Sequence, residues 1–193
     1  MEQLTVGGIG FALILIYDLF QVTGKERLSW LLSLIGYGMV SASVLLPLLS
    51  LRPSATPLPE RFALIAFAAA AFLLLIYSVL FEIPLALKRS GRLATKPRKV
   101  VSVGFYAVVR HPGFLWFTLG LLALVLLYRR GGLIQIAAGL VLFDFILILI
   151  EDLILFPRIF TDYGAYKERV PFILPRISLR RQEPWRHTPT QQG

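Results

Sequence analysis

The chain has 193 residues, of which 56% are hydrophobic and 16% are charged. Soluble domains carry fewer apolar and more charged residues, so this composition excludes an ordinary water-soluble fold. Cysteine is absent, and histidine occurs only at His111 and His187, which excludes disulfides, thiolate metal sites and a histidine-based zinc cluster. We therefore expect one integral membrane domain over residues 1–193, with no bound metal.

Five apolar runs follow one another along the chain, each about as long as a helix needs to cross ~30 Å of hydrocarbon at ~1.5 Å per residue. They cover residues 4–22, 30–51, 62–81, 113–128 and 133–150. Prolines at positions 53, 57 and 59 predict a non-helical connector that continues through Arg61. Only residues 129–132 separate the last two runs, which predicts a tight hairpin. The fold class predicted is an all-α polytopic membrane protein with about five transmembrane helices.

The chain divides into three parts, and the distribution of its basic residues predicts its orientation in the membrane. Residues 1–87 hold the first three predicted helices, residues 88–176 hold a basic segment and the last two helices, and residues 177–193 form a basic tail. In this topology sixteen of the twenty lysines and arginines fall on one side, and the other side keeps Arg52, Arg61, Arg129 and Arg130. Because short basic loops stay cytoplasmic, we expect an inner membrane of the prokaryotic type, the N-terminus outside and the C-terminus in the cytoplasm. Anionic lipid explains the one-sided charge, and no nucleic-acid partner is expected.

Acidic residues inside the apolar runs need a reason, because an ionisable side chain at mid-membrane costs at least ~2.5 to 3.5 kcal/mol on insertion scales. Asp18, Glu82 and Glu151 lie near predicted helix ends, where the interface is one possible source of solvation. Asp144 lies inside the fifth run, seven residues before Glu151. A seven-residue step returns to nearly the same helical face, so both carboxylates are expected to face one interior cleft. The alternative is that Asp144 only bonds a neighbouring helix.

Arg110, His111 and Pro112 begin the fourth predicted helix, where proline is favourable because its missing N–H costs nothing in a first turn. Alone, this tripeptide has an ordinary explanation in which Arg110 extends to lipid phosphates and His111 bonds at the interface. Forty-one residues after Arg110, however, comes the acidic pair of Glu151 and Asp152. Two tyrosines and a Val-Pro dipeptide follow that pair.

This pattern resembles the membrane methyltransferases of the isoprenylcysteine carboxyl methyltransferase and phospholipid methyltransferase superfamily. That family shows a leucine-valine pair, Gly-x-Tyr, Arg-His-Pro, a helical hairpin, an acidic pair, and Tyr-x-x-Tyr before Val-Pro. Here the elements read Val100-Val101, Gly104-Phe105-Tyr106, Arg110-His111-Pro112, Glu151-Asp152, Tyr163-Gly164-Ala165-Tyr166 and Val170-Pro171. The match extends from Arg98 to Arg176 in the expected order and spacing.

The resemblance implies methyl transfer from S-adenosylmethionine, bound in a pocket at the cytoplasmic end of the fourth and fifth helices and the C-terminal tail. Two charge-assisted contacts would hold the zwitterionic end of the cofactor, Arg110 at its carboxylate and Glu151 at its ammonium. These two residues are the expected catalytic residues, and His111 would bond the ribose, the adenine or a catalytic water. The full set of expected cofactor-binding residues is Arg98, Val100, Val101, Tyr106, Arg110, His111, Pro112 and Glu151.

Departures from the family pattern bear on the substrate. Arg98 replaces the usual histidine, Phe114 and Trp116 replace the usual tyrosine and glycine, and Asp152 replaces a second glutamate. The carboxyl methyltransferases place an arginine one turn before the acidic residue, where this chain has Leu147. A substrate carboxylate is therefore disfavoured. We expect a lipophilic partner dissolved in the membrane lipid, such as a lipid amine or an isoprenoid-type small molecule.

Two other functions remain open on the sequence. One is a non-catalytic membrane scaffold or lipid-binding protein that keeps the fold and uses Arg-His-Pro for binding. The other is a reductase of the distantly similar sterol reductase type, which would bind a nicotinamide cofactor in a similar place. The acceptor atom and the oligomeric state do not follow from the sequence.

Overall fold

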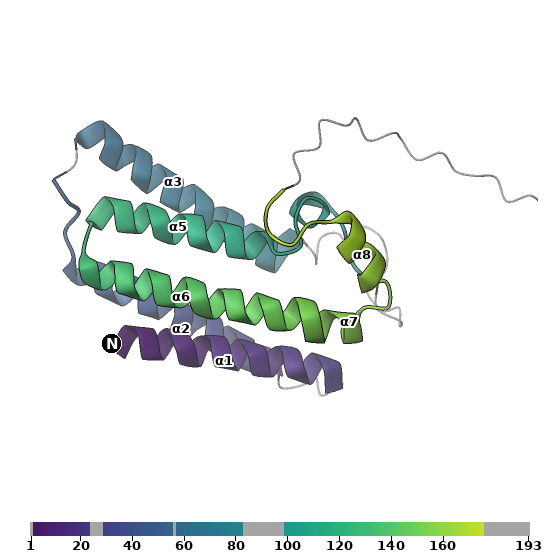
Figure 1. Cartoon of the computed structure of the whole chain (residues 1–193). Helices are drawn as coiled ribbons and strands as arrows, with labels where there is room; N and C mark the ends of the chain where they lie inside the picture. The colour runs from purple at the N-terminus through teal and green to yellow at the C-terminus, as the bar shows by residue number, and fades with distance from the viewer. Residues whose placement is uncertain (1, 24–28, 56, 83–98, 176–193) are drawn as a thin grey trace, which may run out of the picture.

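The computed structural model describes residues 2–23, 29–55, 57–82 and 99–175, and the remaining residues are outside the described part. Within these ranges every regular element is a helix (Figure 1). Four helical stretches are long and apolar enough to cross a membrane: Glu2–Val22, Trp30–Ser50, Leu58–Glu82 and Gly131–Ile159. A fifth apolar helix, Pro112–Tyr128, is shorter, with 17 residues. The all-helical class is thus confirmed for the described residues, with four candidate membrane spans.

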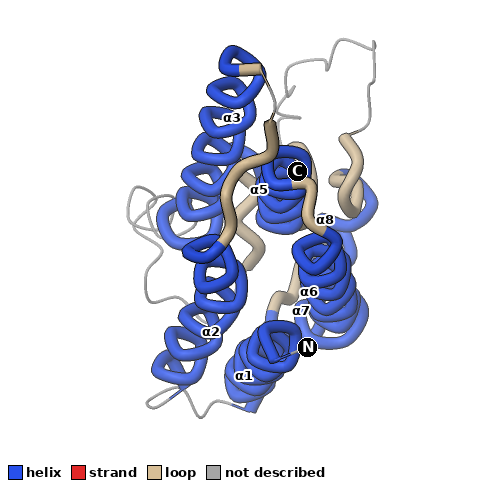
Figure 2. The backbone as a smooth tube through the Cα atoms, turned by 90° about the vertical axis from the view of Figure 1, so that its left-hand side faces the viewer, coloured by secondary structure: helices blue, strands red, loops and turns tan. Residues whose placement is uncertain are grey.

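The long helices pack as two pairs with a single helix between them. These helices are α1 (Glu2–Thr23), α2 (Ser29–Ser50), α3 (Leu58–Ile76), α5 (Pro112–Tyr128) and α6 (Gly131–Ile150). Helix α1 packs along α2, α3 packs along α5, and α6 contacts α1, α2 and α5 (Figure 2). At the α1–α2 crossing, a Cβ on either Gly10 or Gly36 would lie 2.7 Å from the carbonyl oxygen of the other. Only glycine permits so close a backbone approach.

Apolar side chains fill the bundle interior and also cover its outside. Leu121 and Leu140 are fully buried among residues of α1, α2, α5 and α6. Leu34, Leu49 and Leu73, by contrast, are 60%, 84% and 66% exposed. Exposed leucines on several helices make an apolar outer surface that suits lipid rather than water.

The helix boundaries follow the predicted runs with two exceptions. Helix α3 begins at Leu58, so the predicted connector through Arg61 was wrong: Pro59 lies in the first turn, where its missing N–H costs nothing. The last helical run does not stop at Ile150 but continues as α6, η3 (Glu151–Leu155) and α7 (Phe156–Ile159). The tight hairpin is confirmed, since only Arg129 and Arg130 separate α5 from α6.

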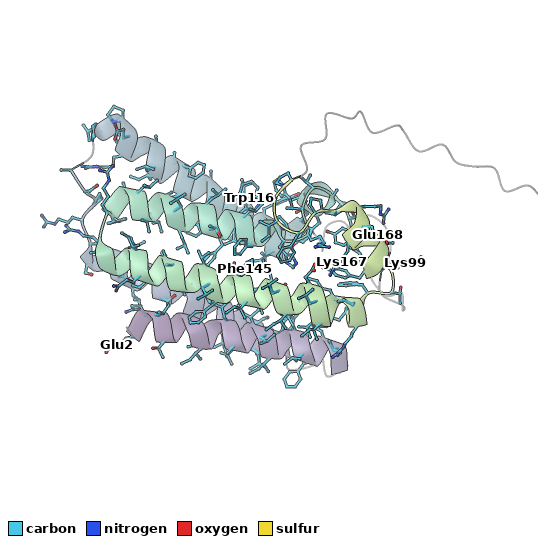
Figure 3. The ribbon with its side chains drawn as sticks, viewed as in Figure 1. Glu2, Lys99, Trp116, Phe145, Lys167 and Glu168 are labelled. Atoms are coloured by element: carbon cyan, nitrogen blue, oxygen red, sulfur yellow. The ribbon has the colours of Figure 1, made fainter. Side chains whose placement is uncertain are left out.

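One end of the bundle gathers the irregular elements. It holds the C-terminal end of α1, the π-helical turn η1 (Tyr77–Glu82), the short helix η2 (Gly104–Ala107), the start of α5, η3 and helix α8 (Tyr163–Arg169) (Figure 1). Lys99 and Lys167 lie at this end, and Glu2 lies at the opposite one (Figure 3). The motif residues of the sequence analysis therefore share one end of the molecule.

Candidate functional site

Arg110, His111 and Pro112 are held against the segment that follows α8. The backbone N–H of Arg110 donates to the carbonyl of Pro171 at 2.9 Å, and that of His111 donates to Phe172 at 3.3 Å. Pro112 occupies the first turn of α5, as predicted, and is fully buried. The Arg-His-Pro and Val-Pro elements, 60 residues apart in the chain, are thus direct neighbours.

Asp152 is the centre of a buried polar network. Its carboxylate is 3.1 Å from Arg110 Nε and 2.8 Å from Lys167 Nζ. The Tyr163 hydroxyl donates a 2.6 Å hydrogen bond to Asp152 Oδ1, and His111 Nε2 lies 3.6 Å from the same oxygen. With only 3% of the residue exposed, Asp152 is a buried charge compensated by two cations, the condition under which such a charge is tolerated.

The neighbouring carboxylate, Glu151, has different surroundings. It is close enough to Asp18 of α1 for a hydrogen bond between the two carboxyl groups, and Asp144 also interacts with it electrostatically. Such a bond requires one of the two groups to carry a proton. The nearest basic group among the described residues is His111, whose Nδ1 is 3.7 Å from Glu151 Oε2. Asp144 and Glu151 are therefore near enough to interact, whereas the interior cleft predicted from their seven-residue spacing stays a prediction.

Glu82 contacts the start of η2 at Gly104 and Phe105. Glu82 Oε1 accepts a 2.6 Å hydrogen bond from the backbone N–H of Phe105. Gly104 has φ +51°, and a Cβ there would collide with the Glu82 carboxylate, so both conformation and space require glycine. Glu82 is 4% exposed, which places it inside the protein rather than at a solvated helix end. The sequence predicts Glu82 only as a helix-end residue, and no local pattern indicates its contact with Phe105.

Tyr106 lies between the two acidic regions. Its hydroxyl donates to the carbonyl of Ser78 at 3.3 Å, and its own carbonyl accepts a 2.6 Å hydrogen bond from the Tyr166 hydroxyl. Burial, together with the nearby Glu151 and Glu82 carboxylates, raises the pKa of Tyr106. Tyr106 is therefore a neutral hydrogen-bond donor at physiological pH.

His111 is neutral for a related reason. Burial lowers its pKa below the ordinary value, and the neighbouring Asp152 opposes this shift only in part. The ring stacks on Phe156 with centroids 5.9 Å apart, and Phe172 meets it edge-on at 5.0 Å. One imidazole nitrogen is therefore an acceptor in the middle of the site.

Of the three remaining predicted site residues, only Val100 has a described polar contact. The backbone N–H of Val100 donates to Asp162 at 2.8 Å, and its side chain packs on Tyr163, Tyr166 and Val170. Val101 is half-buried and has no described polar contact. Arg98 lies outside the described residues. Val100 therefore packs against α8, and its backbone N–H is already bonded.

Helices α3 and α6 each change from α-helical to π-helical geometry at or before an acidic residue. Helix α3 becomes the π-helical turn η1, which ends at Glu82, and α6 becomes η3, which begins at Glu151. A π-turn inserts an extra residue and is frequent at functional sites. No hydropathy pattern signals such a turn, so neither turn could be predicted from the apolar runs.

Several buried polar atoms at this end lack a hydrogen-bond partner in the described part of the chain: Asp18 Oδ2, Glu82 Oε2, His111 Nε2 and Trp116 Nε1. Folded proteins rarely leave such atoms unpaired, so these atoms are candidates for bonding to water or to a polar ligand. Across residues 2–23, 29–55, 57–82 and 99–175, no three His, Asp or Glu side chains are grouped as metal ligands.

Comparison with known proteins adds no relative. No family model, no curated protein and no solved structure matches this chain. The function must therefore be inferred from the motif residues and from the geometry of this end of the bundle.

Proposed function

We propose that the chain is an S-adenosylmethionine-dependent methyltransferase of the membrane that acts on a lipophilic substrate. The observation that supports it most is that the Arg-His-Pro segment meets the acidic pair at one end of the bundle. Arg110 lies 3.1 Å from Asp152, and His111 lies 3.7 Å from Glu151 and 3.6 Å from Asp152. These residues come from the two sequence elements that carry the family resemblance.

The charges at the site suit the cofactor. S-adenosylmethionine supplies an electrophilic methyl group and carries an ammonium, a sulfonium and a carboxylate. Glu151, which no described lysine or arginine neutralises, would receive the ammonium. Arg110 has five donors, of which Nε faces Asp152, so its other N–H groups would receive the carboxylate.

Neutral polar groups would complete the binding and exclude water. Tyr106 and His111 would bond the nucleoside part of the cofactor, and Trp116 offers an indole N–H that is buried without a partner in the described chain. The edge-on contact of Phe105 with Trp116, at 5.2 Å, and the ring of Phe172 would shield this end from water. The chain thus provides positioning and desolvation, which are what a methyl transfer requires of a protein.

The proposed topology has five crossings, with the N-terminus outside and this site at the cytoplasmic face. The one-sided distribution of lysine and arginine supports it. Because the chain has no cysteine, single cysteines at Arg129 and Lys96 would report each side with an impermeant thiol reagent. We expect labelling from outside at Arg129 and not at Lys96, and the reverse pattern would contradict the orientation.

A direct test of the activity uses methyl-labelled S-adenosylmethionine. Membranes that contain the protein should transfer label into the lipid extract, and membranes with Glu151→Gln should not. If both extracts carry the same label as membranes without the protein, the chain does not methylate a membrane lipid, as the scaffold alternative predicts.

A further inference from the structure

Glu82 is a buried carboxyl group that has no part in the proposed function so far. It is 4% exposed, and no lysine or arginine of the described ranges forms an ion pair with it. It also ends the helical run of α3 and η1, where the helix dipole disfavours a negative charge. Burial and this helix end are both unfavourable for a carboxylate, so stability does not explain the residue. It lies outside residues 98–176, which carry the family resemblance.

The contact that explains Glu82 is with the start of η2. Its Oε1 accepts the 2.6 Å hydrogen bond from the backbone N–H of Phe105, one of the first N–H groups of η2, which have no acceptor within that short helix. The carboxyl group also fills the space beside Gly104, whose φ of +51° and missing Cβ permit the approach. Glu82 and Gly104 thus fit each other, and together they fix where η2 begins relative to α3.

Two residues of the proposed cofactor site follow this contact directly in the chain. Tyr106 comes next after Phe105, and its hydroxyl donates to the carbonyl of Ser78 in η1. The Phe105 carbonyl accepts hydrogen bonds of 3.0 Å from the backbone N–H groups of residues 108–109. These two bonds form the turn that leads to Arg110. The position of Phe105 therefore sets the positions of both Tyr106 and Arg110.

We propose that Glu82 is a positioning residue of the cofactor site, which holds η2 so that Tyr106 and Arg110 lie where S-adenosylmethionine needs them. It touches neither cofactor nor substrate and acts through Phe105 and Gly104. The inference rests on the proposed function for the identity of the ligand, whereas the contact itself needs no ligand. Glu82 serves here as a hydrogen-bond acceptor, so its charge is not required.

Hydrogen exchange tests the contact without any cofactor. Exchange over residues 104–107 is compared for wild type, Glu82→Leu and Glu82→Gln, each as the full-length protein in lipid nanodiscs. Leucine offers no acceptor, so Glu82→Leu should speed exchange at the Phe105 N–H about tenfold or more. The amide oxygen of Glu82→Gln can accept that N–H and should preserve the protection. Unchanged exchange in Glu82→Leu would overturn the proposal.

Calorimetric titration with S-adenosylmethionine tests the effect on the site. Glu82→Leu should lose about tenfold in affinity, and Glu82→Gln should bind within about twofold of wild type. The matched control is Glu60→Ala, at the exposed start of the same helix, which should bind as wild type. Melting curves identify any variant that does not fold. Equal losses in Glu82→Leu and Glu82→Gln would show that the charge is required, and would contradict the proposal.

Gly104→Ala tests the fit between the two residues. In wild type the added Cβ meets both an unfavourable left-handed backbone and the Glu82 carboxyl group, whereas in Glu82→Ala only the backbone term remains. Gly104→Ala should therefore weaken cofactor binding by a larger factor in wild type than in the Glu82→Ala background. Equal factors in both backgrounds would show that the two residues do not share this space, and would contradict the proposal.

Failure of this proposal and failure of the proposed function give different results. If wild type and folded Glu82→Leu bind S-adenosylmethionine equally well, the cofactor site stands and Glu82 does not position it. If wild type does not bind S-adenosylmethionine, the proposed function fails and Glu82 loses its assigned role, although exchange over η2 still reports the contact with Phe105.

Discussion

Glu151 and Asp152 follow each other in the chain but face different parts of the bundle. Asp152 points to α8 and is paired with Arg110, Lys167 and Tyr163. Glu151 points to α1, where its neighbours are Asp18 and Asp144. A carboxylate that is already compensated holds the fold together, whereas one among other carboxyl groups is available to a cationic ligand. We therefore propose separable roles for the two residues, structural for Asp152 and ligand-binding for Glu151.

The largest expected effect is the loss of stability on substitution of Asp152, compared with substitution of Glu151. Asp152→Asn leaves the Arg110 and Lys167 cations without their carboxylate, and breaking a buried pair costs ~3 to 5 kcal/mol. We expect the lower end of this range, because the Lys167 side chain is 31% exposed. Thermal unfolding in detergent measures the loss. The matched control is Glu151→Gln, whose amide can also form a hydrogen bond with Asp18 and should change stability by less than ~1 kcal/mol. Equal losses in both variants would remove the distinction.

Arg110→Lys tests the geometry of the same network. Lysine keeps the positive charge but lacks the planar fork and the stacking surface, and Arg110 lies 5.4 Å from the centre of the Phe172 ring. We expect a loss of about 1 to 2 kcal/mol in unfolding free energy. Wild-type stability would show that charge alone suffices at this position.

Lys167→Met should have a smaller effect, within about 1 kcal/mol, because partly exposed ion pairs contribute little. The expected order of destabilisation is therefore Asp152→Asn, Arg110→Lys, Lys167→Met. A larger loss for Lys167→Met than for Arg110→Lys would mean that the bond to α8, and not the bond to the Arg-His-Pro segment, dominates the network.

The smallest effect concerns His111 and pH. Its folded-state pKa is lowered by burial, and the unfolded value is about 6.5. The unfolded chain therefore binds the proton first, so stability is fully present above pH ~6.5 and falls as pH decreases toward the folded pKa. His111→Gln should flatten this part of the curve. An unchanged slope in unfolding experiments between pH 5 and 7 would assign the titration to another group.

Hydropathy alone could predict most of the fold. The apolar runs, the α5–α6 hairpin and the entry of α5 at Pro112 all appear in the structure, because helix length and chain breaks are local properties. The predicted start of α3 is wrong because Pro59 lies in the first turn of the helix and does not break it.

The site could be predicted only in outline. Order and spacing related Arg110 and His111 to Glu151, but they did not predict that Arg110 pairs with Asp152. Adjacent residues of a helix point about 100° apart, so Glu151 and Asp152 face different neighbours. The contacts of Glu82 with Phe105 and of Asp18 with Glu151 join elements far apart in the sequence. No local pattern encodes such contacts, because they are set by how the helices pack.

The most direct test of the account is the affinity of purified protein for S-adenosylmethionine, measured by calorimetric titration of wild type, Glu151→Gln and Asp18→Asn. Wild type should bind, and Glu151→Gln should lose more than tenfold in affinity through the missing contact to the ammonium, ~1.5 to 3 kcal/mol. Asp18→Asn should lose less, because it contacts the cofactor only through Glu151. The absence of binding by wild type, or equal affinities for all three proteins, would contradict the role assigned to Glu151.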